Sequence, residues 1–348
     1  MAEVAHGELS MLVSPASAEH PRQSEASILA FEDGRLLLAY SDFYAGDWRD
    51  EGPACIRGRW SPDAGASWSE PFVVQENIGR LNCMSASLLR LPSGRVLLAF
   101  GRKDVQPVLM DAMVKYSDDE GRTWSDPRPM TRGERYWGMT NDRLLRTASG
   151  RLVYPVYTDD TSCRCCLSDD DGATWRTGGE VAAPDGVRYV EPMVAELPGG
   201  GLAMYIRTTM GNMHVALSDD GEAWRMHKDH APDMCGHPDA GPNAAYAPCM
   251  VKRVPGTDDL LLIWNNNRVR TPLTAAVSHD GGETWRHLRN LEEMDGWPPR
   301  LTHAYPSLAF LGDDVHVTYW EAEGRGGPEE RIGLRYRRLP RVWFYAGE

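Results

Sequence analysis

Ser61-Pro62-Asp63-Ala64-Gly65-Ala66-Ser67-Trp68 fits the pattern S-x-D-x-G-x-[ST]-W, and the chain repeats this pattern. In such a turn the Asp accepts local backbone hydrogen bonds, the Gly takes a positive φ, and the Trp packs on neighbouring apolar surface. Four further copies begin at Ser117, Ser168, Ser218 and Ser278, which gives intervals of 56, 51, 50 and 60 residues. Intervals of this length indicate a repeat protein with about four strands in each unit.

The fourth copy of this motif, the Asp-box, is one residue short and lacks the hydroxyl before Trp224, but it keeps the Asp, the Gly and the Trp. A second pattern counts the units independently, because a turn followed by an apolar run occurs six times. The six runs are residues 36–40, 96–100, 152–156, 202–205, 260–264 and 315–319. Each is typical of a β-hairpin.

The two patterns together predict an all-β fold, a six-bladed β-propeller with Asp-box repeats, as a single domain over residues 1–348. The last unit has a third strand at residues 333–338 but no Asp-box after it. We therefore expect the N-terminal residues 9–13 to supply its outer strand, which would close the ring and remove an open sheet edge.

The composition of the chain bears on its binding partners and on its cellular location. A net charge of -13 argues against nucleic acid or an anionic membrane as the main partner. No apolar stretch is long enough to cross a membrane, and residues 1–10 lack the features of a signal peptide, so the expected location is the cytoplasm.

Seven cysteines leave at least one unpaired. Cys163, Cys165 and Cys166 lie close together, but C-x-C-C lacks the spacing of a zinc site, so we interpret them as buried, reduced strand residues.

Two segments outside the repeats carry more specific information. The first is Tyr189-Val-Glu191-Pro-Met-Val-Ala-Glu-Leu-Pro-Gly-Gly, which leads to Met204-Tyr-Ile-Arg207, and the second is His303-Ala-Tyr305-Pro-Ser-Leu-Ala-Phe-Leu. With the Asp-boxes, they resemble the sialidase (neuraminidase) superfamily of six-bladed propellers over residues 25–336. The resemblance implies that Glu191 is catalytic, that Arg207 binds substrate, and that Tyr305 is the nucleophile.

The chemistry of this family explains a tyrosine nucleophile. A sialic acid carries a carboxylate on its anomeric carbon, and a neutral phenol approaches that centre without the repulsion that a carboxylate would meet, while a nearby Glu takes its proton. Sialidases also bind the carboxylate with Arg residues, whose planar fork suits it. Arg270 fits one of these positions, and Arg268 is an alternative two residues away.

The chain departs from the family in its first unit. Sialidases have an Arg-Ile-Pro motif there, but the aligned position is Ser24, with Arg22 two residues earlier and Glu25 next to it. Arg22 lies on the same strand face and is a candidate replacement, whereas Glu25 brings a negative charge toward the expected carboxylate site. A sugar other than sialic acid is therefore compatible with the site.

The general acid of sialidases is an Asp in a long connection that here offers Asp42, Asp47 and Asp50, of which Asp50 matches best. Asp142 and Arg143 begin another inner strand, which makes them candidates for substrate contact, with an internal salt bridge as the alternative. The loop of residues 229–246 is interpreted as a rim rather than a lid.

The leading hypothesis is an exo-acting, retaining glycoside hydrolase on an acidic sugar, with a small carbohydrate or glycoside as its partner and no metal or cofactor. A homo-oligomer is compatible with the chain. One alternative is a lyase on uronate-containing glycosides, in which Tyr305 or His303 removes a proton. The other is a non-catalytic propeller that binds glycans or proteins.

Overall fold

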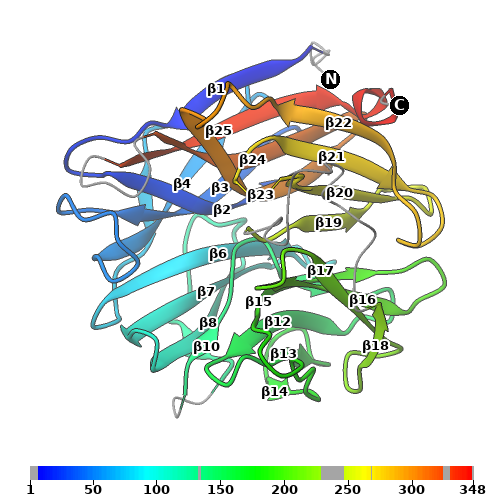
Figure 1. Cartoon of the computed structure of the whole chain (residues 1–348). Coiled ribbons are helices and arrows are strands. Elements are labelled where there is room, and N and C mark those ends of the chain that lie inside the picture. Colours follow the sequence, from blue (N-terminus) through cyan, green and yellow to red (C-terminus); the bar gives the residue numbers. More distant parts are fainter. Residues whose placement is uncertain (1–6, 132–134, 229–246, 268, 324–329, 347–348) are drawn as a thin grey trace.

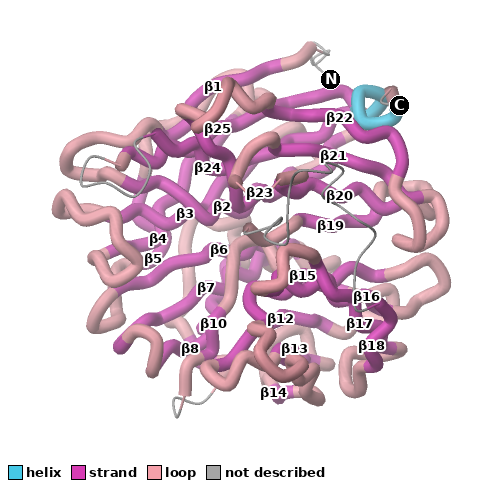
Figure 2. The backbone as a smooth tube through the Cα atoms, in the orientation of Figure 1, coloured by secondary structure: helices cyan, strands magenta, loops and turns pink. Residues whose placement is uncertain are grey.

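The computed structural model describes residues 7–131, 135–228, 247–267, 269–323 and 330–346. Nearly all regular structure in it is strand, with one short 3-10 helix near the C-terminus (Figure 2). The elements, in chain order, are β1 (Leu9–Ser14), β2 (Arg22–Ala30), β3 (Leu36–Phe43), β4 (Ala54–Ser61), β5 (Phe72–Gln75), β6 (Asn82–Arg90), β7 (Val96–Val105), β8 (Leu109–Ser117), β9 (Arg128–Pro129), β10 (Trp137–Gly138), β11 (Leu145–Arg146), β12 (Leu152–Thr158), β13 (Cys163–Ser168), β14 (Arg176–Thr177), β15 (Tyr189–Glu196), β16 (Leu202–Thr208), β17 (Met213–Ser218), β18 (Arg225–Lys228), β19 (Met250–Arg253), β20 (Leu260–Asn265), β21 (Leu273–Ser278), β22 (Arg286–Glu292), β23 (Leu301–Leu311), β24 (Asp314–Glu323), β25 (Arg331–Pro340) and η1 (Arg341–Tyr345).

These strands form six antiparallel blades around a central axis, so the predicted all-β, six-bladed propeller is confirmed (Figure 1). Blade 1 is β2 to β5, blade 2 is β6 to β9, and blade 3 is β10 to β14. Blade 4 is β15 to β18, and blade 5 is β19 to β22. Blade 6 consists of β23, β24 and β25, with β1 as its outer strand.

The ring closes through the N-terminal strand, as the sequence predicts. In blade 6, β1 pairs antiparallel with β25, with Leu9 opposite Arg338 and Met11 opposite Tyr336. A parallel contact between Arg22 and Ile332 then joins β25 to β2, so that blades 6 and 1 share one eight-stranded sheet. Pairing the first strand with the last blade covers an edge that would otherwise be open.

The Asp-boxes adopt the expected turn. In the third box, Asp170 accepts hydrogen bonds from Thr174 N at 2.8 Å and from Thr174 Oγ1 at 2.6 Å. Gly172 takes a φ of 85°, which a residue with a side chain rarely adopts. The degenerate fourth box has no hydroxyl in place of Thr174, and its Asp220 instead accepts a bond from Glu222 N at 2.9 Å.

The box tryptophans join neighbouring blades. Trp68 of blade 1 packs edge-on against Tyr336 of blade 6, with ring centroids 5.2 Å apart. Trp285 of blade 5 packs likewise on Tyr205 of blade 4, at 6.3 Å. The repeated Trp thus buries apolar surface at the outer side of the ring, where blades diverge.

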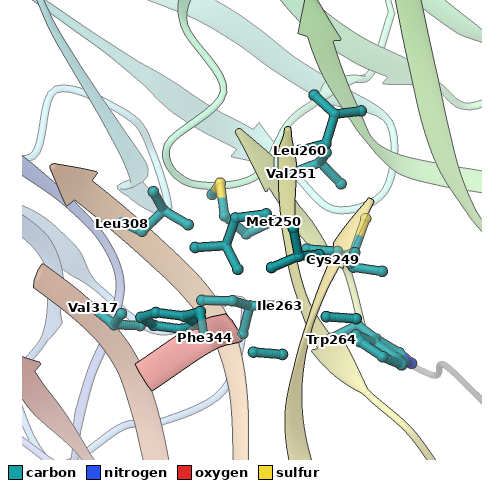
Figure 3. Packing of buried hydrophobic residues seen from close by; sticks show 14 of the residues in the cluster. Cys249, Met250, Val251, Leu260, Ile263, Trp264, Leu308, Val317 and Phe344 are labelled. Atoms are coloured by element: carbon teal, nitrogen blue, oxygen red, sulfur yellow. The ribbon is translucent and has the colours of Figure 1, made fainter. Parts of the chain in front are cut away.

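Apolar side chains fill the spaces between blades. Between blades 5 and 6, Val251 and Ile263 gather with Leu308 and Val317, and Phe344 of η1 covers the same cluster (Figure 3). All five are at most 1% exposed. Replacing such a buried Leu or Ile by Ala typically costs about 2–5 kcal/mol, so these layers hold the blades in fixed positions.

The cysteine prediction is also confirmed, because Cys163, Cys165 and Cys166 are buried on β13 without disulfides. Burial raises the pKa of each of these thiols. Within the described residues, no helix is long and apolar enough to span a membrane. The loop of residues 229–246 and Arg268 lie outside the described residues.

Candidate active site

Three candidate residues occupy equivalent places in three blades. Glu25 on β2, Glu191 on β15 and Tyr305 on β23 each lie at a break in the pairing register of an inner strand. Their φ angles are 44°, 48° and 57°, which is unusual for residues with side chains. Such a bulge re-aims a side chain, and strained backbone of this kind clusters at functional sites.

Tyr305 and Glu191 are in contact. The Tyr305 hydroxyl donates a hydrogen bond to Glu191 Oε1 at 2.8 Å, although 114 positions separate them in the chain. The other carboxylate oxygen of Glu191 accepts a hydrogen bond from the Arg207 guanidinium. Burial, together with the charge of Glu191, raises the pKa of Tyr305. The phenol is therefore neutral and already directed at a proton acceptor.

Arg270 lies on the other side of Tyr305. Its guanidinium carbon is 5.4 Å from the centroid of the Tyr305 ring and 4.6 Å from that of Trp320, in the range of cation–π contacts. Among the described residues, no carboxylate lies within ion-pair distance of Arg270, in contrast to Arg207. Arg270 thus forms no close ion pair among the described residues, although its charge acts on Asp50 at longer range.

Arg22 does reach this cluster, but its charge is already paired. Its guanidinium donates to Asp50 Oδ1 at 2.6 Å, to the Glu25 carboxylate, and to Ser24 Oγ at 2.9 Å. It also lies 5.6 Å from the Trp320 ring. Glu25 is only 1% exposed. A buried Glu needs a partner of this kind, and Arg22 supplies it.

The three aspartates of the blade 1 connection have different surroundings. Asp42 is fully buried and lies within 3.0 Å of His20 and Arg57, which is a structural environment. Asp47 pairs with Arg49 near the surface. Only Asp50 lies beside Arg22, and its backbone carbonyl accepts bonds from Asn82 at 2.9 Å and Lys103 at 3.1 Å.

The charge of Arg22 lowers the pKa of Asp50 to about 2, with smaller contributions from Lys103 and Arg270 and an opposing effect of partial burial. The Asp50 side chain is 55% exposed, so solvent also reaches it. Asp50 is consequently an anion at neutral pH in the free protein.

This pairing predicts a pH dependence. An unfolded Asp has a pKa near 3.9, so a pKa lowered to about 2 stabilises the fold above about pH 4 and loses that contribution between about pH 4 and 2. We expect the free energy of unfolding of Asp50→Asn to fall less than that of the wild type between about pH 4 and 2. Urea unfolding at several pH values measures this free energy, and Asp185→Asn, at an exposed loop aspartate, is the control. Equal pH dependence in wild type and Asp50→Asn would contradict the Arg22–Asp50 pairing.

The structure places Asp142 and Arg143 differently from the substrate-contact hypothesis. Asp142 forms the internal salt bridge that the sequence left as the alternative, at 2.7 Å from Lys252 Nζ, and it also accepts a bond from Ser27 Oγ. Arg143 is 1% exposed, with its Nη1 at 3.0 Å from Met193 Sδ. Both side chains are buried where the inner strands converge, and the contacts of Asp142 are those of the internal salt bridge.

His303 is likewise buried. It is 3% exposed, packs against Tyr319, and has its Nε2 at 3.4 Å from Glu321. No contact with Tyr305 or Glu191 is formed, although His303 is only two residues from Tyr305. His303 therefore pairs with Glu321 rather than with the Tyr305–Glu191 pair, and its role as a base stays a prediction.

Trp320 is the residue of this cluster that sequence reasoning left without a role. It is 5% exposed, lies 4.8 Å from the Tyr305 ring, and has Arg22 and Arg270 on its faces. Trp320 lies opposite Ala304 on the neighbouring strand, next to Tyr305, and this pairing of β23 with β24 is the signal from which its place in the site could have been predicted. On the other side of Arg22 lies Phe43, which is fully buried.

Comparison with known proteins agrees with this fold. Residues 55–317 match a family model described as a BNR repeat-like domain. An anhydrosialidase of Macrobdella decora is 31% identical over 121 residues, which are 32% of this chain and 16% of that protein. A sialidase of Paraclostridium sordellii is 24% identical over 235 residues, or 58% of this chain and 56% of that protein.

The chain thus matches less than two thirds of the length of either relative. Among solved structures, the intramolecular trans-sialidase from Ruminococcus gnavus in complex with oseltamivir carboxylate superposes with a TM-score of 0.75. That match covers 96% of this chain and 97% of the other at 15% identity, a likeness of fold. The match over most of the chain and the shared propeller lead to one conclusion: the protein belongs to the BNR repeat-like domain family, within the sialidase superfamily.

Proposed function

We propose that this protein is an exo-acting, retaining glycosidase that acts on an acidic sugar. The observation that carries the proposal is the hydrogen bond from the Tyr305 hydroxyl to Glu191 at 2.8 Å, with Arg207 on the other oxygen of Glu191. A protein that only binds a ligand has no need for a buried phenol directed at a carboxylate. A nucleophile beside its base, with a third group that orients the base, is the arrangement of covalent catalysis.

In the first step, Tyr305 Oη forms a bond to the anomeric carbon while the glycosidic C–O bond breaks. The phenolic proton passes to Glu191, and Asp50 protonates the leaving oxygen. In the second step a water attacks the same carbon, Asp50 takes its proton, and Glu191 returns the first proton to Tyr305. Two displacements at one carbon retain its configuration.

The acidic group of the substrate binds to the cations around Trp320. Arg270 is the foremost of them, because it has no carboxylate partner among the described residues, and Arg207 supports it from the side of Glu191. Asp50 is ionised in the free protein, since Arg22 lowers its pKa. It gains a proton once the substrate competes with it for Arg22.

The same ionised Asp50 favours a second candidate, elimination from a uronate. There Tyr305 first passes its phenolic proton to Glu191 and then, as a phenolate, removes the proton next to the carboxylate. It gives that proton to the leaving oxygen as the C–O bond breaks, and Glu191 then returns the first proton, so that Tyr305 serves as both base and acid. This reaction needs no proton from Asp50. A carboxylate held by Arg270 would stabilise the negative charge that develops next to it.

Incubation with a panel of acidic glycosides in ¹⁸O-labelled water distinguishes these reactions by mass spectrometry. A hydrolase incorporates one labelled oxygen into the released reducing sugar, and this is the result that we expect. The Tyr305→Phe variant, prepared in the same way, controls for contaminating enzymes.

An unlabelled product whose mass is one water lower than that of the reducing sugar would contradict the proposal of a hydrolase. If that product absorbs in the far ultraviolet, it contains the double bond of an elimination. If it does not, a hydroxyl of the sugar has attacked its own anomeric carbon. Saturable binding of the glycosides without any product would identify a non-catalytic propeller.

A further inference from the structure

Two histidines face each other at the outer end of blade 5, away from the Tyr305 cluster. His279 belongs to the turn of the fifth Asp-box, and His287 is the second residue of β22. Their Nε2 atoms are 3.3 Å apart, and their rings are nearly perpendicular, with an interplanar angle of 84°. His279 is 44% exposed, so ions in solution have access to the pair.

The far nitrogen of His279 is held by a carboxylate. His279 Nδ1 lies 2.7 Å from Asp259 Oδ1, while the other oxygen of Asp259 accepts a hydrogen bond from the Tyr345 hydroxyl at 2.7 Å. Donation from Nδ1–H to the carboxylate leaves the lone pair of His279 on Nε2, facing His287. A carboxylate on the far nitrogen is the usual support of a metal-binding histidine, because it fixes the tautomer and makes the ligand more basic.

The backbone at His287 is shaped to produce this contact. His287 has a φ of 57°, and the pairing of β21 with β22 shifts register between Ala275 and Val277, at the position of His287. A positive φ costs free energy at a residue with a side chain. A regular strand would alternate its side chains and direct this ring elsewhere, whereas the bulge turns it back toward His279.

We propose that His279 and His287 form a binding site for Zn²⁺. Two imidazole nitrogens at about 2.0–2.1 Å from a tetrahedral zinc ion are about 3.3–3.4 Å apart, which is the separation found here. The separation of 3.3 Å is also longer than the range of about 2.7–3.2 Å that protein N–H···O hydrogen bonds occupy. Within the described residues no group of three or more His, Cys, Asp or Glu converges on one point. Zinc therefore has two protein ligands, and water completes its coordination.

Binding requires that His287 present its Nε2 lone pair to the ion, as His279 does. The ion would connect the fifth Asp-box to β22. Through Asp259 and Tyr345 it would also reach η1, which lies beside β22 at the C-terminal end (Figure 1). The site is thus placed to hold the C-terminal segment against blade 5, independently of catalysis.

Titration calorimetry with zinc chloride and chelator-treated protein at neutral pH tests the proposal. We expect the wild-type chain to bind one equivalent of Zn²⁺ at this site. In His279→Gln and in His287→Gln, this equivalent should be lost or bound at least about tenfold more weakly. Asp259→Asn should weaken the same equivalent by about ten- to a hundredfold, as is usual when the carboxylate behind a metal-binding histidine is removed. Zinc should raise the Tm of the wild type more than that of either histidine variant.

His227→Gln is the matched control. His227 is another surface histidine with a carboxylate partner, Glu283 at 2.6 Å, and it is not part of the His279–His287 pair. This variant should bind zinc as the wild type does. The proposal is wrong if wild-type protein binds no zinc saturably, or if the double variant His279→Gln/His287→Gln binds as many equivalents as the wild type with the same affinity.

Discussion

Replacing Tyr305 by phenylalanine is expected to reduce kcat by on the order of 10³-fold or more, while the protein stays folded and still binds its substrate. The change removes one hydroxyl, which is the group that donates to Glu191 at 2.8 Å. The ring, its contact with Trp320 and its place beneath Arg270 remain. Loss of a nucleophile affects the transition state far more than the ground state, so KM should change little.

The measurement compares steady-state kinetics of wild type and Tyr305→Phe on the substrate found in the ¹⁸O experiment. Tyr40→Phe is the control, because Tyr40 is also a buried strand tyrosine, and its hydroxyl accepts a hydrogen bond from Ser14 Oγ at 3.0 Å. It should lose some stability and keep its activity. If Tyr305→Phe retains activity within a few-fold of wild type, Tyr305 has no chemical role.

Glu25→Gln is expected to increase kcat/KM for a simple aryl sialoside by about ten- to a hundredfold from a poor starting value. In the wild type, the Glu25 and Asp50 carboxylates both pair with Arg22, so an incoming carboxylate meets a charge that is already compensated. A charge-assisted hydrogen bond contributes about 1.5–3 kcal/mol, which corresponds to that range in affinity. Glutamine keeps the shape and removes the competing charge.

Wild type and variant are compared on the aryl sialoside and on the preferred acidic glycoside, and the prediction concerns the ratio of the two kcat/KM values. Glu196→Gln is the matched control, since Glu196 accepts a hydrogen bond from Ala148 N at 2.7 Å and lies apart from the cluster around Trp320. Efficient cleavage of the aryl sialoside by the wild type, together with an unchanged ratio in Glu25→Gln, would show that Glu25 does not set the preference.

The Glu25→Gln prediction concerns the position at which this chain departs from the sialidase motif. The family resemblance aligned Ser24 with a carboxylate-binding Arg and left open whether Arg22 replaces it. In the structure Arg22 enters the cluster, but it is bound to two carboxylates, one of which is buried. We propose that the preferred substrate presents its acid to Arg270 and a hydroxyl or amine to Glu25.

Several features of the fold and the site are determined by the amino-acid sequence alone. The Asp-boxes and the turns define the blades, because each turn needs a specific Asp, Gly and Trp within eight residues. The closure by residues 9–13 follows from counting strands in the last blade. The roles of Glu191 and Tyr305 were predicted from short segments that resemble sialidase motifs, in which each residue precedes a proline.

The partners of these residues were decided only by the tertiary structure. Alternation along a strand predicts which face a side chain takes, but residues on different blades meet according to how the blades are rotated about the axis. Hence the sequence could not show that Trp320 lies between Arg22 and Arg270, or that Asp142, Arg143 and His303 are buried inside the ring. The contact between His279 and His287 could not be predicted either, because it depends on a bulge in β22. Whether a charged or titratable group is paired depends on which groups surround it in three dimensions, and the sequence alone does not give these neighbours.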